Sequence, residues 1–261
     1  MLRALRTAAL GMSTQQTGVD NIANNLANAN TTGFKRSAVV FQDLLYQTVQ
    51  ASGEEQAAAA PPASLQLGHG AAAIATVRQF TQGGLTETGG ALDLAVSGEG
   101  FFQVRRPDGS LAYTRDGTFA LGPDGLVVTQ TGLALEPDLE IPPEAVEVHV
   151  SQDGIVAVRL EGEPDLVELG QVELARFANP AGLKALGGNL YAQTDASGEP
   201  TPGTPGLDGL GTVRQGYLEA SNVDVVKEMV DLIAAQRAYE INSKMVTTSE
   251  DMLQIANNLK R

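Results

Sequence analysis

The stretch that decides the fold is the C-terminal run Ala234-Ala-Gln-Arg-Ala-Tyr-Glu-Ile-Asn-Ser-Lys-Met-Val-Thr-Thr-Ser-Glu-Asp-Met-Leu-Gln-Ile-Ala-Asn-Asn-Leu259. Positions 234, 238, 241, 245, 248, 252, 255 and 259 step by four and three without a slip, and all except Thr248 are apolar; this is the heptad spacing of a helix that packs through one stripe. No proline or glycine interrupts it, and Ser221 to Asp224 resembles a capping box with Asp in place of Glu. We predict one long helix over about 223–261. Its seam comprises Val230, Ile233, Ala238, Ile241, Met245, Met252, Ile255 and Leu259.

The N-terminal residues carry a matching pattern. Apolar and small residues recur at alternating steps of three and four, with one polar break at Gln16. The run 28–33 combines asparagine, threonine and glycine, which together stop a helix. We therefore predict a helix over about 3–28. Its seam comprises Leu2, Leu5, Ala9, Met12, Val19, Ile22 and Leu26.

The two terminal helices are expected to pair as a coiled-coil hairpin. Two helices alone cannot bury all of this apolar surface, so we predict that the seams also assemble an oligomer. Asparagine is dense in both segments, for example at Asn21, Asn24, Asn25 and Asn242. Near a seam it can fix register and partner choice; a solvated face or a frayed terminus explains it equally well.

The middle of the chain predicts β-structure, which makes the fold class α+β. Asp-Gly turn signals at residues 108, 116 and 124 separate short apolar runs, and this pattern is typical of an antiparallel meander. Further strands are predicted over 146–150, 155–160 and 167–177. The predicted organisation is a helical domain of 1–30 and 223–261, a connecting segment 31–70 and a β-rich outer domain 71–222. Within the connection, 51–64 is an Ala/Pro-rich insertion that resembles a surface loop.

The composition and motifs of the chain argue against most kinds of catalytic and binding site. The chain has 261 residues, a net charge of -14 and no cysteine, which disfavours nucleic-acid binding and excludes thiolate chemistry. Only His69 and His149 are present, without metal-ligand spacing, and no nucleotide-binding or Gly-x-Ser-x-Gly motif occurs. We predict no catalytic residue, metal or cofactor, and hence no enzyme. No stretch is long and apolar enough for membrane insertion, and Arg6 argues against a cleaved signal peptide.

Residues 21–36 resemble the signature of bacterial flagellar rod and hook axial proteins. Three further stretches are similar to the family's central and C-terminal motifs: 98–104, 113–119, and 215–223 together with 235–243. The resemblance covers the chain from end to end. The signature positions are Asn24, Asn25, Leu26, Ala27, Asn28, Thr32, Gly33, Phe34 and Lys35.

Within this family, length and the segment 41–48 favour the subunit of the distal rod. Another axial subunit, such as a proximal rod or hook-like protein, and a secreted wall-modifying enzyme are the alternatives. The resemblance implies export by the flagellar type III apparatus without signal-peptide cleavage. It also implies assembly in the basal body into a hollow helical shaft that transmits torque. The implied partners are copies of the chain, other rod and hook-family proteins, and the P-ring and L-ring bushing.

Overall fold

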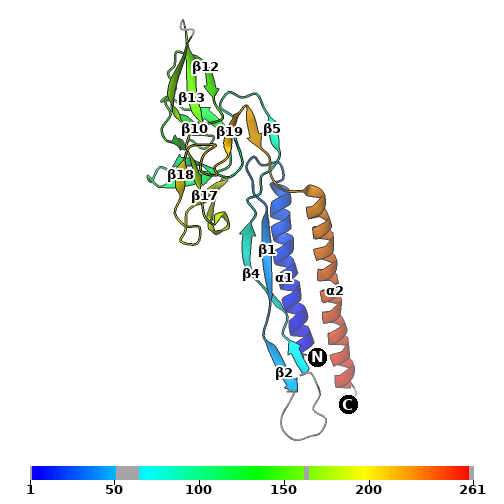
Figure 1. The fold of residues 1–261 in the computed structure, drawn as a ribbon. Helices are drawn as coiled ribbons and strands as arrows, with labels where there is room; N and C mark the ends of the chain where they lie inside the picture. Colours follow the sequence, from blue (N-terminus) through cyan, green and yellow to red (C-terminus); the bar gives the residue numbers. More distant parts are fainter. Residues whose placement is uncertain (1, 51–64, 162–164, 259–261) are drawn as a thin grey trace. The chain divides into compact units, whose positions relative to one another are not determined.

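A computed structural model describes residues 2–50, 65–161 and 165–258, and the chain divides into two compact units (Figure 1). The helical unit comprises Met1–Ala27, Ser37–Val77 and Asp224–Arg261. The β unit comprises Asn28–Arg36 and Arg78–Val223. Segment 71–77 thus belongs with the helices, and 31–36 belongs with the β region. The insertion 51–64 and Leu259 lie outside the described residues.

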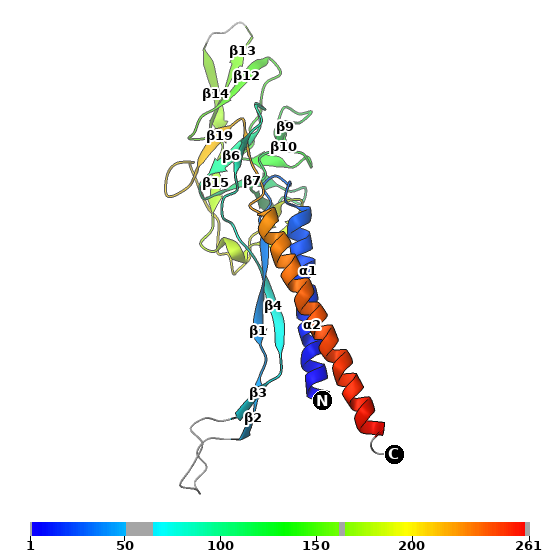
Figure 2. The ribbon, with the colours of Figure 1, turned by 90° about the vertical axis from the view of Figure 1, so that its right-hand side faces the viewer.

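The helical unit contains both predicted helices. α1 (Leu2–Ala27) and α2 (Val225–Asn258) lie side by side in both views, so the predicted pairing of the terminal helices is confirmed (Figures 1 and 2). β1 (Ser37–Asp43) contacts α1 and pairs with β4 (Ala71–Arg78). Further along the same hairpin, β2 (Tyr46–Gln50) pairs antiparallel with β3 (Leu65–Gly68).

The start of α2 differs from the predicted capping box. Asp224 is the residue that caps the helix, because its Oδ1 accepts the N–H groups of Val226 at 3.0 Å and Lys227 at 3.2 Å. Ser221 instead accepts the N–H of Val223 through its Oγ. The carboxylate satisfies free N–H groups at the positive end of the helix dipole, which favours Asp over Ser at this position.

The β unit is mainly antiparallel, as predicted. Its largest sheet runs β16-β17-β8-β7-β11-β10-β9, with β15 on β7 and β18 on β15, while β12-β13-β14, β19-β6 and β20-β5 form smaller sheets. The element bounds are β5 Leu85–Glu87, β6 Leu94–Ser97, β7 Phe101–Arg105, β8 Leu111–Thr114, β9 Phe119–Leu121, β10 Val127–Thr129, β11 Ala134–Glu136, β12 Ala145–Val150, β13 Ile155–Leu160, β14 Leu166–Gln171, β15 Leu174–Arg176, η1 Pro180–Gly182, β16 Lys184–Gly187, β17 Leu190–Ala192, β18 Thr201–Gly203, β19 Thr212–Gln215 and β20 Tyr217–Glu219.

The predicted meander is wrong at Asp116-Gly117. The signals at 108 and 124 do join antiparallel neighbours, β7 to β8 and β9 to β10. β8 and β9 do not pair with each other, because Asp116 Oδ1 accepts the N–H and hydroxyl of Thr118 and the Gly117 carbonyl accepts the N–H of Leu94. This Asp-Gly step therefore holds the chain against the start of β6 instead of reversing it.

The predicted strand 167–177 is two strands. β14 pairs with β13, whereas β15 pairs with β7 and β18. Val172 lies between them, fully buried, and donates its N–H to the Gly154 carbonyl. The chain changes sheets here because this apolar residue enters the core that the two sheets share. That core is centred on Phe102, Val104, Leu135, Val158 and Leu174.

We predict that Gly117→Ala destabilises the β unit by about 3 kcal/mol or more, at the upper end of overpacking costs. An added Cβ would lie 1.5 Å from the Leu94 carbonyl oxygen, so backbone must move. Urea unfolding of the purified chain, followed by near-ultraviolet circular dichroism of its tyrosines, measures the change.

Gly84→Ala is the matched control, since an added Cβ there meets nothing within 4 Å. It should change the free energy of unfolding by less than about 0.5 kcal/mol. Equal effects of the two substitutions would contradict this account of Gly117.

Candidate assembly surface and buried polar network

The apolar stripe predicted on α2 is largely exposed. Val230 and Ile241 expose 60% and 62% of their surface. The remaining large members of the stripe are exposed as well: Ile233, Met245, Met252 and Ile255. Ala238 is half-buried. Within the helical unit, no residue that the structure describes covers these apolar side chains.

α1 packs on a different face of α2. The buried residues of α2 are Glu228 and Ala235, and those of α1 are Ala8, Thr14 and Asn25. A Cβ added at Gly11 would lie 3.0 Å from Asn242 Nδ2, which places small and polar residues where the helices approach. Close approach through small side chains leaves the larger stripe outside.

The predicted seam of α1 is half-buried at most of its positions. These are Leu5, Met12, Val19, Ile22 and Leu26, whereas Ala9 is exposed. Val19 also lines a groove between the two helices, together with Gln16, Gln236, Tyr239 and Glu240. Amide and carboxylate groups thus interrupt the apolar surface between α1 and α2.

Asn25 is the signature residue that is fully buried in the helical unit. Its side chain is fully buried, and its Nδ2 donates to Ser37 O at 2.8 Å and to Glu228 Oε2 at 3.1 Å. Its Oδ1 accepts the N–H of Ser37 at 3.0 Å. Asn25 therefore joins α1, β1 and α2 through one amide. The neighbouring signature residues Asn24 and Ala27 are exposed.

The rest of the signature forms a tight segment in the β unit. Asn28 Oδ1 accepts the Thr31 hydroxyl at 3.1 Å, and the Thr32 carbonyl accepts Asn189 Nδ2 at 2.9 Å. Gly33 has φ +68°, and a Cβ there would lie 2.6 Å from the Asp116 nitrogen, so only glycine fits. Phe34 is buried, with the Arg78 guanidinium 5.8 Å from its ring centroid.

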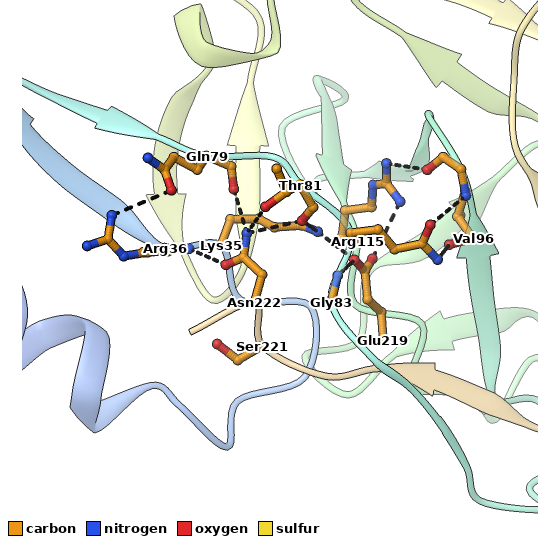
Figure 3. Close-up of polar contacts among 12 residues, drawn as sticks. Lys35, Arg36, Gln79, Thr81, Gly83, Val96, Arg115, Glu219, Ser221 and Asn222 are labelled. Carbon is orange, nitrogen blue, oxygen red and sulfur yellow. Dashed lines mark hydrogen bonds and ion pairs between the residues drawn. The ribbon is translucent and has the colours of Figure 1, made fainter. Parts of the chain in front are cut away.

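Lys35 lies in a buried charge network with Glu219 and Arg115 (Figure 3). Lys35 Nζ contacts Glu219 Oε1 at 2.5 Å and donates to Thr81 O at 2.8 Å. Arg115 Nη1 lies 3.4 Å from Glu219 Oε2, and Gly83 donates its N–H to Glu219 Oε1 at 2.8 Å. All three charged side chains are at most 4% exposed. Burial lowers the pKa of Lys35, and the Glu219 carboxylate opposes that effect.

Asn222 extends this network on the same side of the β unit (Figure 3). Its Oδ1 accepts the N–H of Arg36 at 2.7 Å, while its Nδ2 donates to the carbonyls of Gln79 and Thr81. Residues 33–36, 79–83 and 219–222 are therefore fastened together, although they are far apart in the sequence. The sequence pattern gave Lys35 as a signature position, but it assigned no role to Arg115, Glu219 or Asn222. Arg, Glu and Asn are mostly exposed in proteins, so the sequence alone does not indicate that these three residues meet in one network.

Neither a metal-binding cluster nor a membrane-spanning helix occurs in the part of the chain that the structure describes. Among them no cluster of three or more His, Cys, Asp or Glu side chains could hold a metal ion. His69 lies at the end of β3 in the helical unit and His149 lies on β12 in the β unit, so the two histidines serve different units. No helix within the described ranges has the length and hydropathy of a membrane span. The notable features of the described residues are therefore the exposed apolar stripe of α2 and the buried polar network around Glu219.

Three family models match the chain in order along its length. They are described as flagella basal body rod protein over residues 5–35, flagellar hook protein FlgE/F/G D1 domain over 95–158, and flagellar basal body rod FlgEFG protein C-terminal over 214–259. The first model covers residues 21–35 of the predicted signature, and the other two contain the remaining stretches of the predicted resemblance in full.

Curated relatives match over essentially the whole chain. The flagellar basal-body rod protein FlgG of Borreliella burgdorferi is 48% identical and that of Bacillus subtilis 38% identical, each with full coverage of both chains. In Caulobacter vibrioides, FlgG is 45% identical over 99% of this chain, whereas the rod protein FlgF is 38% identical over 93%. The comparison within one organism favours FlgG over another axial subunit.

The chain belongs to the family of flagellar basal-body rod and hook proteins. Within that family it groups with FlgG, which confirms the prediction of a structural subunit of the flagellar distal rod. Its relatives are structural components of the flagellar basal body.

We predict that Glu219→Gln lowers the free energy of unfolding of the β unit by about 3–5 kcal/mol, because two buried cations then lose their counter-charge. Lys35→Met should cost less, since Arg115 still pairs with Glu219. Urea unfolding measures both.

The control is Glu147→Gln, which removes a carboxylate from an exposed pair with Arg159. It should cost no more than about 1 kcal/mol. A Glu219→Gln variant as stable as this control would show that the buried network does not hold the β unit together.

Proposed function

We propose that the chain is a self-assembling subunit that forms the distal rod as a hollow helical shaft and transmits torque across the periplasm. The observation that carries this proposal is the exposed stripe on α2. A helix pair that forms through small and polar residues keeps its larger apolar side chains available for other copies. An interface between non-equivalent surfaces that does not close on itself produces a filament.

The energetics favour association through this stripe. Burying one large aliphatic side chain stabilises a complex by about 1.5–3 kcal/mol before ordering costs. Six large apolar residues of the predicted seam are exposed on α2 alone: Val230, Ile233, Ile241, Met245, Met252 and Ile255. Neighbouring copies that cover this stripe would supply the driving force for growth. The helical unit would then form the inner tube and the β unit the outer wall.

The long hairpin of β1 to β4 supplies a second apolar surface. Phe41, Leu45, Tyr46 and Ile74 are exposed on it, Leu45 to 86%. These strands follow the first helix, where the family resemblance implies a segment that reaches along the tube and stiffens it. The proposed role of the insertion 51–64 is to extend this reach.

The remaining partners follow from the proposed place in the basal body. They are other rod subunits, hook-family proteins, the P-ring and L-ring bushing, and the type III export apparatus, through which the chain would pass uncleaved. The role is structural and not enzymatic. Residues 37–222 are more acidic than the whole chain, whose net charge is -14, because residues 1–36 are net basic; this region would repel an acidic bushing. Rod rotation and ring fit should then depend on ionic strength.

Ile241→Asp and Met252→Asp should each block rod growth, because a charge in the stripe cannot be buried between copies without a large desolvation cost. The β unit should stay folded in both. Electron microscopy of basal bodies from cells that carry each variant measures rod growth. Gln254→Asp, an equal charge change at another exposed position of α2, should leave rods normal. Normal rods from the stripe variants would contradict the proposal.

A chain without residues 1–30 and 223–261 should remain soluble, folded and monomeric. It lacks both helices and hence the stripe, while the buried network of Lys35, Arg115 and Glu219 remains intact. Analytical ultracentrifugation and near-ultraviolet circular dichroism test this expectation. Filaments formed by the truncated chain would refute assembly through the terminal helices.

A further inference from the structure

Glu228 is an acidic residue whose side chain is buried in the helical unit. Its side chain is 0% exposed, and it lies in the first turn of α2. Asn25 Nδ2 donates to its Oε2 at 3.1 Å. The amino end of a helix favours a carboxylate, and the hydrogen bond offsets part of the cost of removing it from water. An apolar side chain at this buried position would avoid the cost of removing a polar group from water.

Asn25 is held in one orientation by the first residue of β1. Ser37 donates its N–H to Asn25 Oδ1, and the Ser37 carbonyl accepts from Asn25 Nδ2. A flipped amide would set donor against donor and acceptor against acceptor, so the assignment follows from the backbone of Ser37. Asn21 adds two more hydrogen bonds to the same serine. The hydrogen bonds to Ser37 thus fix the Asn25 amide independently of α2, and its second Nδ2 hydrogen points to Glu228.

The position of Glu228 determines which face of α2 meets α1. At about 100° per residue, Glu228, Ala235 and Asn242 share one face, and Asn242 is the residue that approaches Gly11. Ile233, Ile241 and Ile255 lie about 140° or more around the helix from Glu228. Burial of apolar surface alone would favour the opposite rotation, with the large side chains turned toward α1. Something other than apolar burial therefore selects the observed packing.

We propose that the Asn25–Glu228 pair is a register lock that sets the rotation and axial position of α2 on α1. Rotation of the stripe toward α1 would leave a buried N–H of Asn25 without its acceptor. A slip of one helical turn would move Glu228 about 5.4 Å away from it. The lock keeps the stripe of α2 directed outward. Its importance for assembly rests on the proposed function, whereas the lock itself is a property of the single chain.

Disulfide trapping in the full-length chain tests the lock, because the native sequence has no cysteine. The pair Gly11→Cys with Asn242→Cys reports the observed packing. The pair Gly11→Cys with Ile241→Cys reports packing with the stripe turned inward, because Ile241 lies about 100° around the helix from Asn242 at nearly the same axial level. Mild oxidation in dilute solution should cross-link the first pair within one chain and the second at least about tenfold less, a difference that corresponds to roughly 1.4 kcal/mol.

Glu228→Leu removes the acceptor while it keeps a side chain of similar size. It should lower the first cross-link about tenfold and raise the second. Glu228→Gln, which keeps an acceptor for Asn25, should retain the observed packing. Glu250→Leu makes the same change at an exposed position of α2 and should alter neither yield. Near-ultraviolet signals from the buried Tyr113 and Tyr191 report whether the β unit remains folded.

Three outcomes would overturn the lock. The first cross-link could fail to form in the otherwise native chain, or its yield could be indifferent to Glu228→Leu. Loss of both cross-links in that variant would mean that Glu228 stabilises the helix pair without choosing its face. Rod assembly plays no part in these yields. Cross-links that behave as expected in a chain that never enters rods would count against the proposed function and not against the lock.

Discussion

The constraint on which the β unit depends is the burial of one carboxylate, that of Glu219, between two cations. Its oxygens contact Lys35 and Arg115 and accept the N–H of Gly83, at points that lie far apart in the sequence. Each buried charge is tolerable only while the others are present. The network therefore specifies one arrangement of the segments around residues 35, 83 and 219, and Asn222 repeats the connection with neutral hydrogen bonds.

The helical unit uses the same principle with a single charge. Asn25 connects Ser37 to Glu228, so a polar contact decides how two helices meet although neither helix lacks apolar side chains. The helix pair therefore forms while the larger apolar side chains of α2 stay exposed. Such a subunit is suited to association, because the apolar burial that a solitary fold would use internally remains available between copies.

Periodicity predicted the terminal helices well. The three-and-four steps of α1 and α2 are a local property, and their bounds in the structure differ from the predicted ones by one or two residues where both are described. The same pattern also located the apolar stripe. It could not reveal that Glu228, Ala235 and Asn242 face α1, because small and polar residues give no hydrophobic signal. The β region was predictable by class and by most of its Asp-Gly turns.

The wrong or missing predictions in the β unit share one cause. At Asp116-Gly117 the turn chemistry is present, but the chain continues past the Leu94 carbonyl instead of reversing. At Val172 a run that alternates like one strand passes between two sheets. The contacts that define the network join residues about 100 positions or more apart in the sequence. They link Arg115 to Glu219, Glu219 to Lys35, and Asn222 to Arg36. Local propensity cannot encode contacts of this range, which tertiary packing decides.

The division of the chain has a consequence for the order in which it can fold. The helical unit takes residues from both extremities and from 37–77, and the β unit closes only when Glu219 and Asn222 reach Lys35 and Arg36. If the polypeptide is delivered to its destination with its N-terminus leading, α1 has no helical partner until α2, which begins at Val225, has emerged. Neither compact unit can therefore be completed early. Both units depend on residues from 219 onward, so a delivery interrupted before that point would leave neither of them closed.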